Sequence, residues 1–96
     1  MVVVVAYDVK TESKEGRRRL RRVAQTCENY GQRVQKSVFE CLVSGADWVQ
    51  LRHRLLAEFS EKEDSLRFYF LDQTARDRVE HHGKGRPVDL TSPLIV

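Results

Sequence analysis

Two groups of charged residues near the start of the chain have types and positions suited to chemistry. The first is a single carboxylate, Asp8, which follows a run of valines where a predicted strand ends. A carboxylate at the carboxyl end of a strand is well placed to bind a metal ion or to act on a substrate. The alternative is that Asp8 caps the turn or helix that follows, which is a common role for aspartate.

The second group is a run of arginines, made of Arg17, Arg18, Arg19, Arg21 and Arg22. Such closely spaced positive charges repel one another unless an anion is present, so the run favours the phosphates of a nucleic acid as its partner. The alternative is a solvated helix face, which is what most runs of charge are. No recognition helix or base-stacking pattern accompanies the run, so we expect it to bind duplex without sequence preference.

The strand that carries Asp8 is predicted at the centre of a sheet, because β-branched side chains favour strands. Alternation divides its side chains into two sets, each apolar as far as Asp8. One set is Val2, Val4, Ala6 and Asp8, and the other is Val3, Val5, Tyr7 and Val9. A strand that is apolar on both faces belongs in the interior of a sheet rather than at its edge.

The arginine run lies on a helix that is predicted from Ser13, a candidate N-cap, to about Asn29. Gly31 suits the left-handed position that ends many helices. Apolar residues recur at i, i+3, i+4 and i+7 and form one buried stripe. This stripe consists of Leu20, Val23, Ala24 and Cys27.

The five arginines are distributed around this helix. At about 100° per residue, Arg18 and Arg22 lie opposite the buried stripe. Arg19 and Arg21 lie on its flanks, and Arg17 lies near its edge. Arg18 and Arg22 are therefore the arginines that we expect to be most exposed.

The rest of the chain predicts a βαββαβ order, which is the ferredoxin-like α+β arrangement. Two short strands over residues 32–36 and 37–43 are joined by a tight connection, and the last strand covers 66–71. Ser44 begins a second helix with the capping signature S-x-x-D. The buried stripe of that helix is Trp48, Leu51, Leu55, Leu56 and Phe59.

In this fold both helices cover one face of the sheet, so the second apolar face of the first strand needs another cover. A second copy of the same sheet would cover it in a two-fold homodimer. We expect residues 1–72 to form the ferredoxin-like domain. We expect the tail, residues 73–96, to pack on the partner subunit and to supply an extra C-terminal strand, with 78–82 and 94–96 as candidates.

The composition indicates one globular domain of 96 residues, 41% hydrophobic and 32% charged. No apolar run is long enough to cross a membrane, and the opening valines lack the features of a signal peptide. Cys27 and Cys41 have no metal-type spacing and are expected to be reduced core residues. We therefore expect a cytoplasmic protein without a membrane partner.

Three segments of the chain resemble the CRISPR-associated protein 2 family. They are Tyr7-Asp8-Val9, Gly16-Arg17-Arg18-Arg19-Leu20 and Tyr30-Gly31-Gln32-Arg33-Val34-Gln35-Lys36-Ser37-Val38-Phe39-Glu40-Cys41. The resemblance covers nearly all of residues 1–72. It implies a homodimeric ferredoxin-like protein of prokaryotic adaptive immunity, which sits with the CRISPR-associated protein 1 integrase in the complex that inserts new spacers into a CRISPR array.

The resemblance also implies a site, since several members of that family are magnesium-dependent endonucleases on RNA or DNA that use the aspartate matching Asp8. One carboxylate holds a metal ion only if a dimer brings Asp8 and its symmetry mate together, as two oxygen ligands for one Mg²⁺ or Mn²⁺. Tyr7, Ser37 and Phe39 are candidates to line this site, with interface core as the alternative for Phe39.

We therefore expect a nucleic-acid-binding homodimer that scaffolds spacer integration on duplex DNA. Metal-dependent endonuclease activity, on DNA or on single-stranded RNA, is expected as a secondary function. One rival is a purely structural dimeric adaptor without catalysis. Another is an RNA-recognition module, which shares the βαββαβ order, but residues 37–43 lack the aromatic pattern that such modules use to stack bases.

Overall fold

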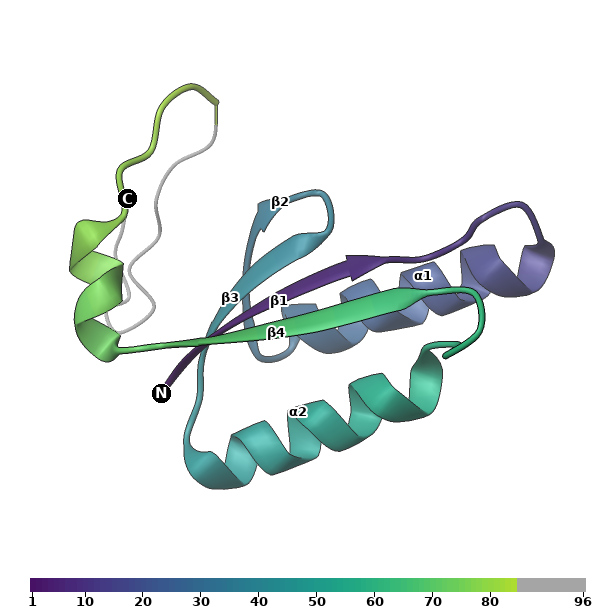
Figure 1. Ribbon diagram of the computed structural model, residues 1–96, viewed down its shortest axis with the longest axis horizontal. Helices are drawn as coiled ribbons and strands as arrows, with labels where there is room; N and C mark the ends of the chain where they lie inside the picture. The colour runs from purple at the N-terminus through teal and green to yellow at the C-terminus, as the bar shows by residue number, and fades with distance from the viewer. Residues whose placement is uncertain (85–96) are drawn as a thin grey trace.

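The computed structural model describes residues 1–84, which form one antiparallel sheet and two α-helices (Figure 1). The 3-10 helix η1 (Gln73–Arg78) extends past the end of the last strand. The observed order confirms the predicted βαββαβ arrangement. The elements are β1 (Val2–Asp8), α1 (Lys14–Glu28), β2 (Gly31–Gln35), β3 (Val38–Leu42), α2 (Gly45–Glu58) and β4 (Ser65–Leu71).

The first strand lies in the interior of the sheet, as its apolar sequence predicts. The strand order is β2-β3-β1-β4, so β1 is hydrogen-bonded on both edges. Val5 of β1 lies opposite Phe39 of β3 on one side and Phe68 of β4 on the other. Because the register is antiparallel throughout, these three side chains share one face of the sheet.

Both helices pack on that same face and enclose the core. The fully buried side chains come from β1, β3 and the two helices, and Trp48 of α2 packs edge-on against Phe68, with ring centroids 4.8 Å apart. Leu56 was predicted in the stripe of α2 but is 38% exposed, because the helix buries the side defined by Leu51 and Leu55. The buried core is Val3, Val5, Tyr7, Val9, Val23, Cys27, Phe39, Cys41, Val43, Leu51 and Leu55.

The helix caps were predicted correctly. The Ser13 hydroxyl accepts a hydrogen bond from the Gly16 amide at 2.9 Å, and the Ser44 hydroxyl accepts one from Asp47 at 3.1 Å. These bonds satisfy amides that have no partner within the helix. The two serines therefore fix where α1 and α2 begin.

The role predicted for Gly31 was wrong. Gly31 does not have positive φ and instead begins β2. A Cβ at this position would lie 2.5 Å from the sulfur of Cys41 and closer still to the carbonyl oxygen of Glu40. Glycine is required here because β3 approaches the backbone so closely, and not for its conformational freedom.

The two cysteines are free and fully buried, as expected. Burial raises the pKa of the Cys27 thiol to about 12 and that of the Cys41 thiol to about 11. Thiols with such high pKa values carry almost no thiolate at neutral pH, so they are poor nucleophiles and poor metal ligands. Both cysteines act as small apolar core residues.

The segment after β4 differs from its prediction. Arg78 ends η1, and residues 79–82 form no strand within the described part of the chain. The second candidate strand, 94–96, lies outside the described residues. Within residues 1–84, neither α-helix has the length and apolar character needed to cross a membrane.

The other face of the sheet carries no helix. Val4, Ala6 and Val38 are only partly buried there, and Tyr69 and Leu71 are 45% and 43% exposed. The register places Val4 between Glu40 and Tyr69, near the middle of this face. We call this apolar surface the open sheet face, and the homodimer expected through it stays a prediction.

A lysine at Val4 tests that dimer. Val4→Lys would place a long charged side chain at the centre of the open sheet face, where a second copy would have to remove its water, so we expect sedimentation at micromolar concentration to show a folded monomer where the parent chain is a dimer. Val49, which is 66% exposed on α2, provides the control, because Val49→Lys should leave the dimer intact. A Val4→Lys protein that remains dimeric would mean that the copies associate elsewhere.

Candidate functional site

Asp8 lies where β1 ends, and its side chain is exposed. It pairs with Ser65 of β4 and belongs by alternation to the open sheet face. Its neighbours Tyr7 and Val9 point the other way and are 5% and 8% exposed. The carboxylate therefore stands at the rim of the sheet, beside both faces.

A pocket of about 480 Å³ opens beside Asp8, between α1 and the turn that joins β2 to β3. It brings together Asp8, two of the three residues predicted to line its site and two of the predicted arginines. These residues are separated by up to 30 positions in the sequence and meet only through the fold. The pocket is lined by Tyr7, Asp8, Val9, Arg17, Leu20, Arg21, Ala24, Arg33, Lys36 and Ser37.

Tyr7 and Ser37 line this pocket together with Asp8, and Phe39 does not, while the metal site that all three were predicted to line stays a prediction. The Tyr7 hydroxyl donates to the carbonyl oxygen of Lys36 at 3.4 Å, and the Tyr7 amide donates to that of Ser37 at 3.0 Å. Phe39 is fully buried, with its ring centroid 6.3 Å from that of Tyr7. Phe39 belongs to the hydrophobic core of this chain, where its ring stacks on that of Tyr7.

Sequence reasoning missed Arg33 and Lys36, which complete the basic rim of the pocket. The Arg33 guanidinium lies 4.8 Å from the centroid of the Phe39 ring, and its Nη1 donates to the carbonyl oxygen of Lys36 at 2.6 Å. The signal that could have found Arg33 is its register opposite Phe39, which turns both side chains toward α1. Burial raises the pKa of Tyr7, an effect that the nearby positive charge of Arg33 opposes.

Four of the five predicted arginines are exposed on α1, and we call Arg17, Arg18, Arg21 and Arg22 the arginine face. Together they line a hollow of about 460 Å³. Arg17 and Arg21 also line the pocket beside Asp8, so the basic surface continues from the helix to the carboxylate. Arg22 also lies 3.5 Å from Glu58 of α2, a surface ion pair of little energetic weight.

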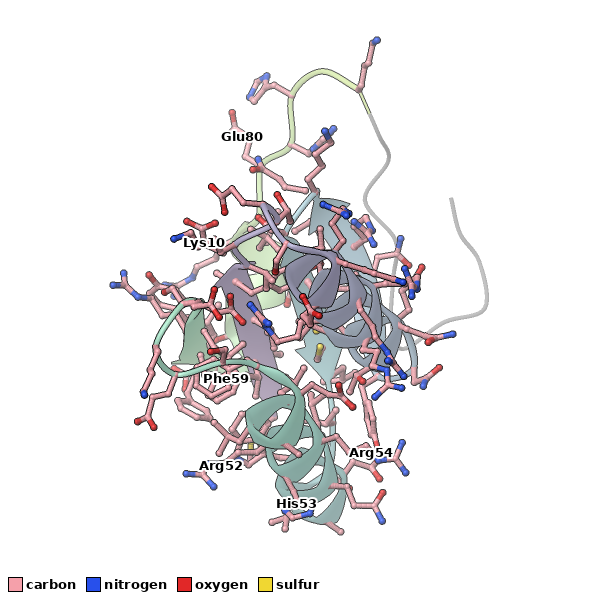
Figure 2. The ribbon with its side chains drawn as sticks, turned by 90° about the vertical axis from the view of Figure 1, so that its right-hand side faces the viewer. Lys10, Arg52, His53, Arg54, Phe59 and Glu80 are labelled. Atoms are coloured by element: carbon pink, nitrogen blue, oxygen red, sulfur yellow. The ribbon has the colours of Figure 1, made fainter. Side chains whose placement is uncertain are left out.

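The basic residues of α2 lie outside the pocket beside Asp8. Figure 2 shows His53 pointing away from the sheet, Arg52 and Arg54 on opposite flanks of α2, and Phe59 between the end of α2 and the strands. His53 is exposed, so the prediction that it is a surface residue is confirmed. None of these α2 residues lines the pocket beside Asp8.

Arg19 differs from the other arginines because the structure gives it an internal partner. Its Nε and Nη2 donate to the two carboxylate oxygens of Asp64 at 2.8 and 3.2 Å. The Asp64 side chain is fully buried and also accepts hydrogen bonds from the amides of Ser60, at 2.8 Å, and Lys10, at 3.1 Å. Arg19 was predicted to bind nucleic acid, but its guanidinium is already occupied by this carboxylate.

The Asp64 carboxylate fixes the loop that follows Asp8. Lys10 lies in this loop (Figure 2), and a Cβ at Gly16 would clash with the Lys10 carbonyl oxygen, so the loop packs closely on the start of α1. Arg17 also donates to the carbonyl oxygen of Thr11 at 3.2 Å. These contacts hold the end of β1 against α1 and so position Asp8 relative to the arginines.

No residue group in the described part of the chain could enclose a metal ion, since no three His, Cys, Asp or Glu side chains converge there. Asp8 places one exposed carboxylate, with its two oxygen atoms, at the rim of the sheet. Magnesium and manganese prefer such hard oxygen ligands. Asp8 is therefore a chemically suitable ligand for such an ion, and the metal site stays a prediction.

The Asp64 contacts predict how stability depends on pH. Burial opposes ionisation of this carboxyl, but the hydrogen bonds from Arg19, Ser60 and Lys10 together outweigh it and lower its pKa below the ordinary 3.8. A lowered pKa stabilises the folded state above the unfolded pKa, and this contribution is lost as the pH falls through the folded value. Urea unfolding should show Asp64→Asn destabilised by roughly 2 kcal/mol at pH 7.

Below pH 4, the same measurement should show a smaller difference in the free energy of unfolding between the parent and Asp64→Asn. Glu63→Gln provides the control, because the Glu63 carboxylate is 46% exposed and lies 3.7 Å from Arg19, so this change should cost little at any pH. A constant gap between the parent and Asp64→Asn from pH 7 to pH 3 would contradict the assigned pKa.

Comparisons with known proteins give a consistent result. The sequence model of the family described as CRISPR associated protein Cas2 matches residues 1–79. The CRISPR-associated endoribonuclease Cas2 of Chlorobaculum tepidum is 60% identical over the whole length of both chains. The CRISPR-associated endonuclease Cas2 of Halalkalibacterium halodurans is 47% identical, with 99% of each chain covered.

Solved structures agree with the sequence comparisons. The crystal structure of Streptococcus pyogenes Cas2 matches with a TM-score of 0.77 at 54% identity, covering 86% of this chain and 100% of that one. A hypothetical protein from Thermus thermophilus matches with a TM-score of 0.71 at 32% identity, covering 88% and 93% of the two chains. These identities exceed what a shared fold alone requires.

Proposed function

The chain belongs to the CRISPR-associated protein Cas2 family, and from this we propose that it is a homodimeric, metal-dependent endonuclease that also scaffolds spacer integration. Relatives with this family's fold and up to 60% identity are named endoribonucleases or endonucleases. The family assignment also favours this function over the RNA-recognition module, which has the same order of elements.

One observation carries the proposal: Asp8 shares a pocket with four cationic side chains. Arg17 and Arg21 approach from α1, and Arg33 and Lys36 approach from the β2–β3 turn. A carboxylate next to so many cations suits a phosphodiester, because the cations hold the phosphate oxygens while the carboxylate serves the reacting centre. A purely structural surface would not require this arrangement.

The residues of the chain bind and orient the phosphate. Arginine guanidinium groups can engage two phosphate oxygens at once, and Lys36 adds a mobile point charge. Tyr7 faces the core and its pKa is raised, so it stays protonated and cannot accept a proton from water. In the described residues Ser37 has no neighbouring histidine or carboxylate among the pocket's lining except Asp8, so we assign it no nucleophilic role.

The proposed metal ion lies between two copies of the chain. Two Asp8 carboxylates, one from each copy, would hold Mg²⁺ or Mn²⁺ where the open sheet faces meet at their rims. When bound, the ion supplies Lewis-acid polarisation of the phosphate and a more acidic water molecule. The pocket between α1 and the β2–β3 turn is lined by one carboxylate, Asp8, and by no histidine that could act as a separate general base, so we expect cleavage to be slow.

The scaffolding role uses the arginine face. Two-fold symmetry would repeat this face at a fixed distance, which suits the binding of a short duplex along its phosphates. The proposed partner is the CRISPR-associated protein 1 integrase, which would act at either end of that duplex. Slow cleavage by the dimer leads us to place scaffolding first and cleavage second.

Replacement of Asp8 tests the chemistry. Asp8→Asn keeps the shape of the side chain but removes the charge, so Mg²⁺- or Mn²⁺-dependent cleavage of labelled RNA and DNA should fall at least a hundredfold. Asp72→Asn alters another exposed carboxylate that follows a strand and should leave cleavage unchanged. Full activity in carefully purified Asp8→Asn would assign cleavage to another site.

Spacer insertion, assayed with the integrase, tests the scaffold. Arg18→Ala combined with Arg22→Ala should reduce insertion and flatten the salt dependence of duplex binding, because fewer phosphate contacts form. Arg52→Ala removes a positive charge from the flank of α2 opposite Arg54 and should have a much smaller effect. Asp8→Asn should still support insertion. Insertion lost in Asp8→Asn but kept in the arginine variant would reverse the two roles.

A further inference from the structure

The pocket beside Asp8 has an apolar part that phosphate binding does not use. Its cations lie around residues of a different kind, namely Tyr7, Val9, Leu20 and Ala24. We propose that these four residues form a floor that accepts the base of one unstacked nucleotide, while the basic rim holds that nucleotide's phosphate. The inference rests on the proposed function, since it names the part of the nucleic acid that enters the pocket.

The floor is held rigidly. Tyr7 and Val9 belong to the buried core, and Leu20 and Ala24 pack against it from α1. Arg17, Leu20, Arg21 and Ala24 recur at i, i+3, i+4 and i+7, so one side of α1 presents two cations and two apolar side chains to the pocket. A volume of about 480 Å³ lies within the range of small-molecule sites.

The rim is pre-organised for a flat ligand. Arg33 is supported on the Phe39 ring and is bonded to the carbonyl oxygen of Lys36, which uses one of its five N–H donors. A guanidinium held in this way can stack on a base or bind a phosphate without losing much freedom. The combination of apolar floor, planar cation and charged rim fits a nucleotide better than it fits a bare phosphate.

The pocket would stay open in the proposed homodimer. Tyr7 and Val9 of the floor point to the face of the sheet that packs against the helices, whereas the dimer would use the open sheet face. Bases inside a duplex are stacked and paired and cannot enter such a pocket. The pocket therefore selects single strands, frayed ends or bulges, whereas the arginine face accepts duplex phosphates.

A substitution that fills the apolar floor without changing its charge tests the base pocket. The probes are a fluorescent four-nucleotide single-stranded DNA and the same backbone with every base removed, both in EDTA so that no cleavage occurs. Ala24→Leu should weaken binding of the intact oligonucleotide about fivefold, in line with the contribution of one stacked base. Binding of the abasic strand should not change. Ala57→Leu makes the identical change at an exposed position on α2 and should alter neither.

The outcomes distinguish a failure of the base pocket from a failure of the proposed function. Equal weakening of intact and abasic strands by Ala24→Leu, or no effect on either, would overturn the base pocket while leaving nucleic-acid binding intact. Failure of the parent protein to bind any strand or duplex would overturn the proposed function and the pocket with it. Thermal unfolding of each variant shows whether the fold survives the substitution.

A second measurement needs no variant. Adenosine monophosphate and ribose 5-phosphate carry the same phosphate and sugar, and only the first has a base. In amide NMR spectra of the parent protein, adenosine monophosphate should shift Leu20, Ala24 and Val9, whereas ribose 5-phosphate should shift only the rim near Lys36 and Ser37. Identical shift patterns for the two compounds would mean that the floor does not recognise a base.

Discussion

The whole fold depends on one constraint, that β1 must be covered on both edges and both faces. Strands β3 and β4 satisfy its hydrogen-bonding groups, and α1 and α2 cover the side of Val3 and Val5. The opposite side, with Val4 and Ala6, is left with only partial cover. Asp8 is placed by the same constraint, because it is the first residue of β1 at which the apolar pattern stops.

Most of the fold could be predicted from the sequence, because its signals are local. The valine run, the serines at Ser13 and Ser44, and the helical spacing of Leu51 and Leu55 each determine one element within a few residues. The role of Gly31 was predicted wrongly because it depends on a contact that is distant in the sequence. Its role depends on the approach of Cys41, ten residues later on another strand, and no pattern near Gly31 indicates this contact.

The candidate site was only partly predictable for the same reason. Asp8, Tyr7, Ser37 and the exposed arginines were identified from strand ends, charge and family resemblance. Arg19 could not be distinguished from its neighbours, because its partner Asp64 lies 45 residues away in a loop of unremarkable charged sequence. Lys36 belongs to a turn whose position over α1 follows only from the register of β2 against β3.

Arg17 and Arg21 belong to two surfaces at once, the hollow on α1 and the pocket beside Asp8. A guanidinium whose planar fork is aligned with a phosphate in one surface is not at the same time aligned with a phosphate in the other. Nucleic acid along the helix and nucleic acid in the pocket would therefore compete for the same two side chains. If both proposed roles hold, this competition would set duplex binding against cleavage, and a dimer that is loaded with duplex would be protected from cutting the nucleic acid that it carries.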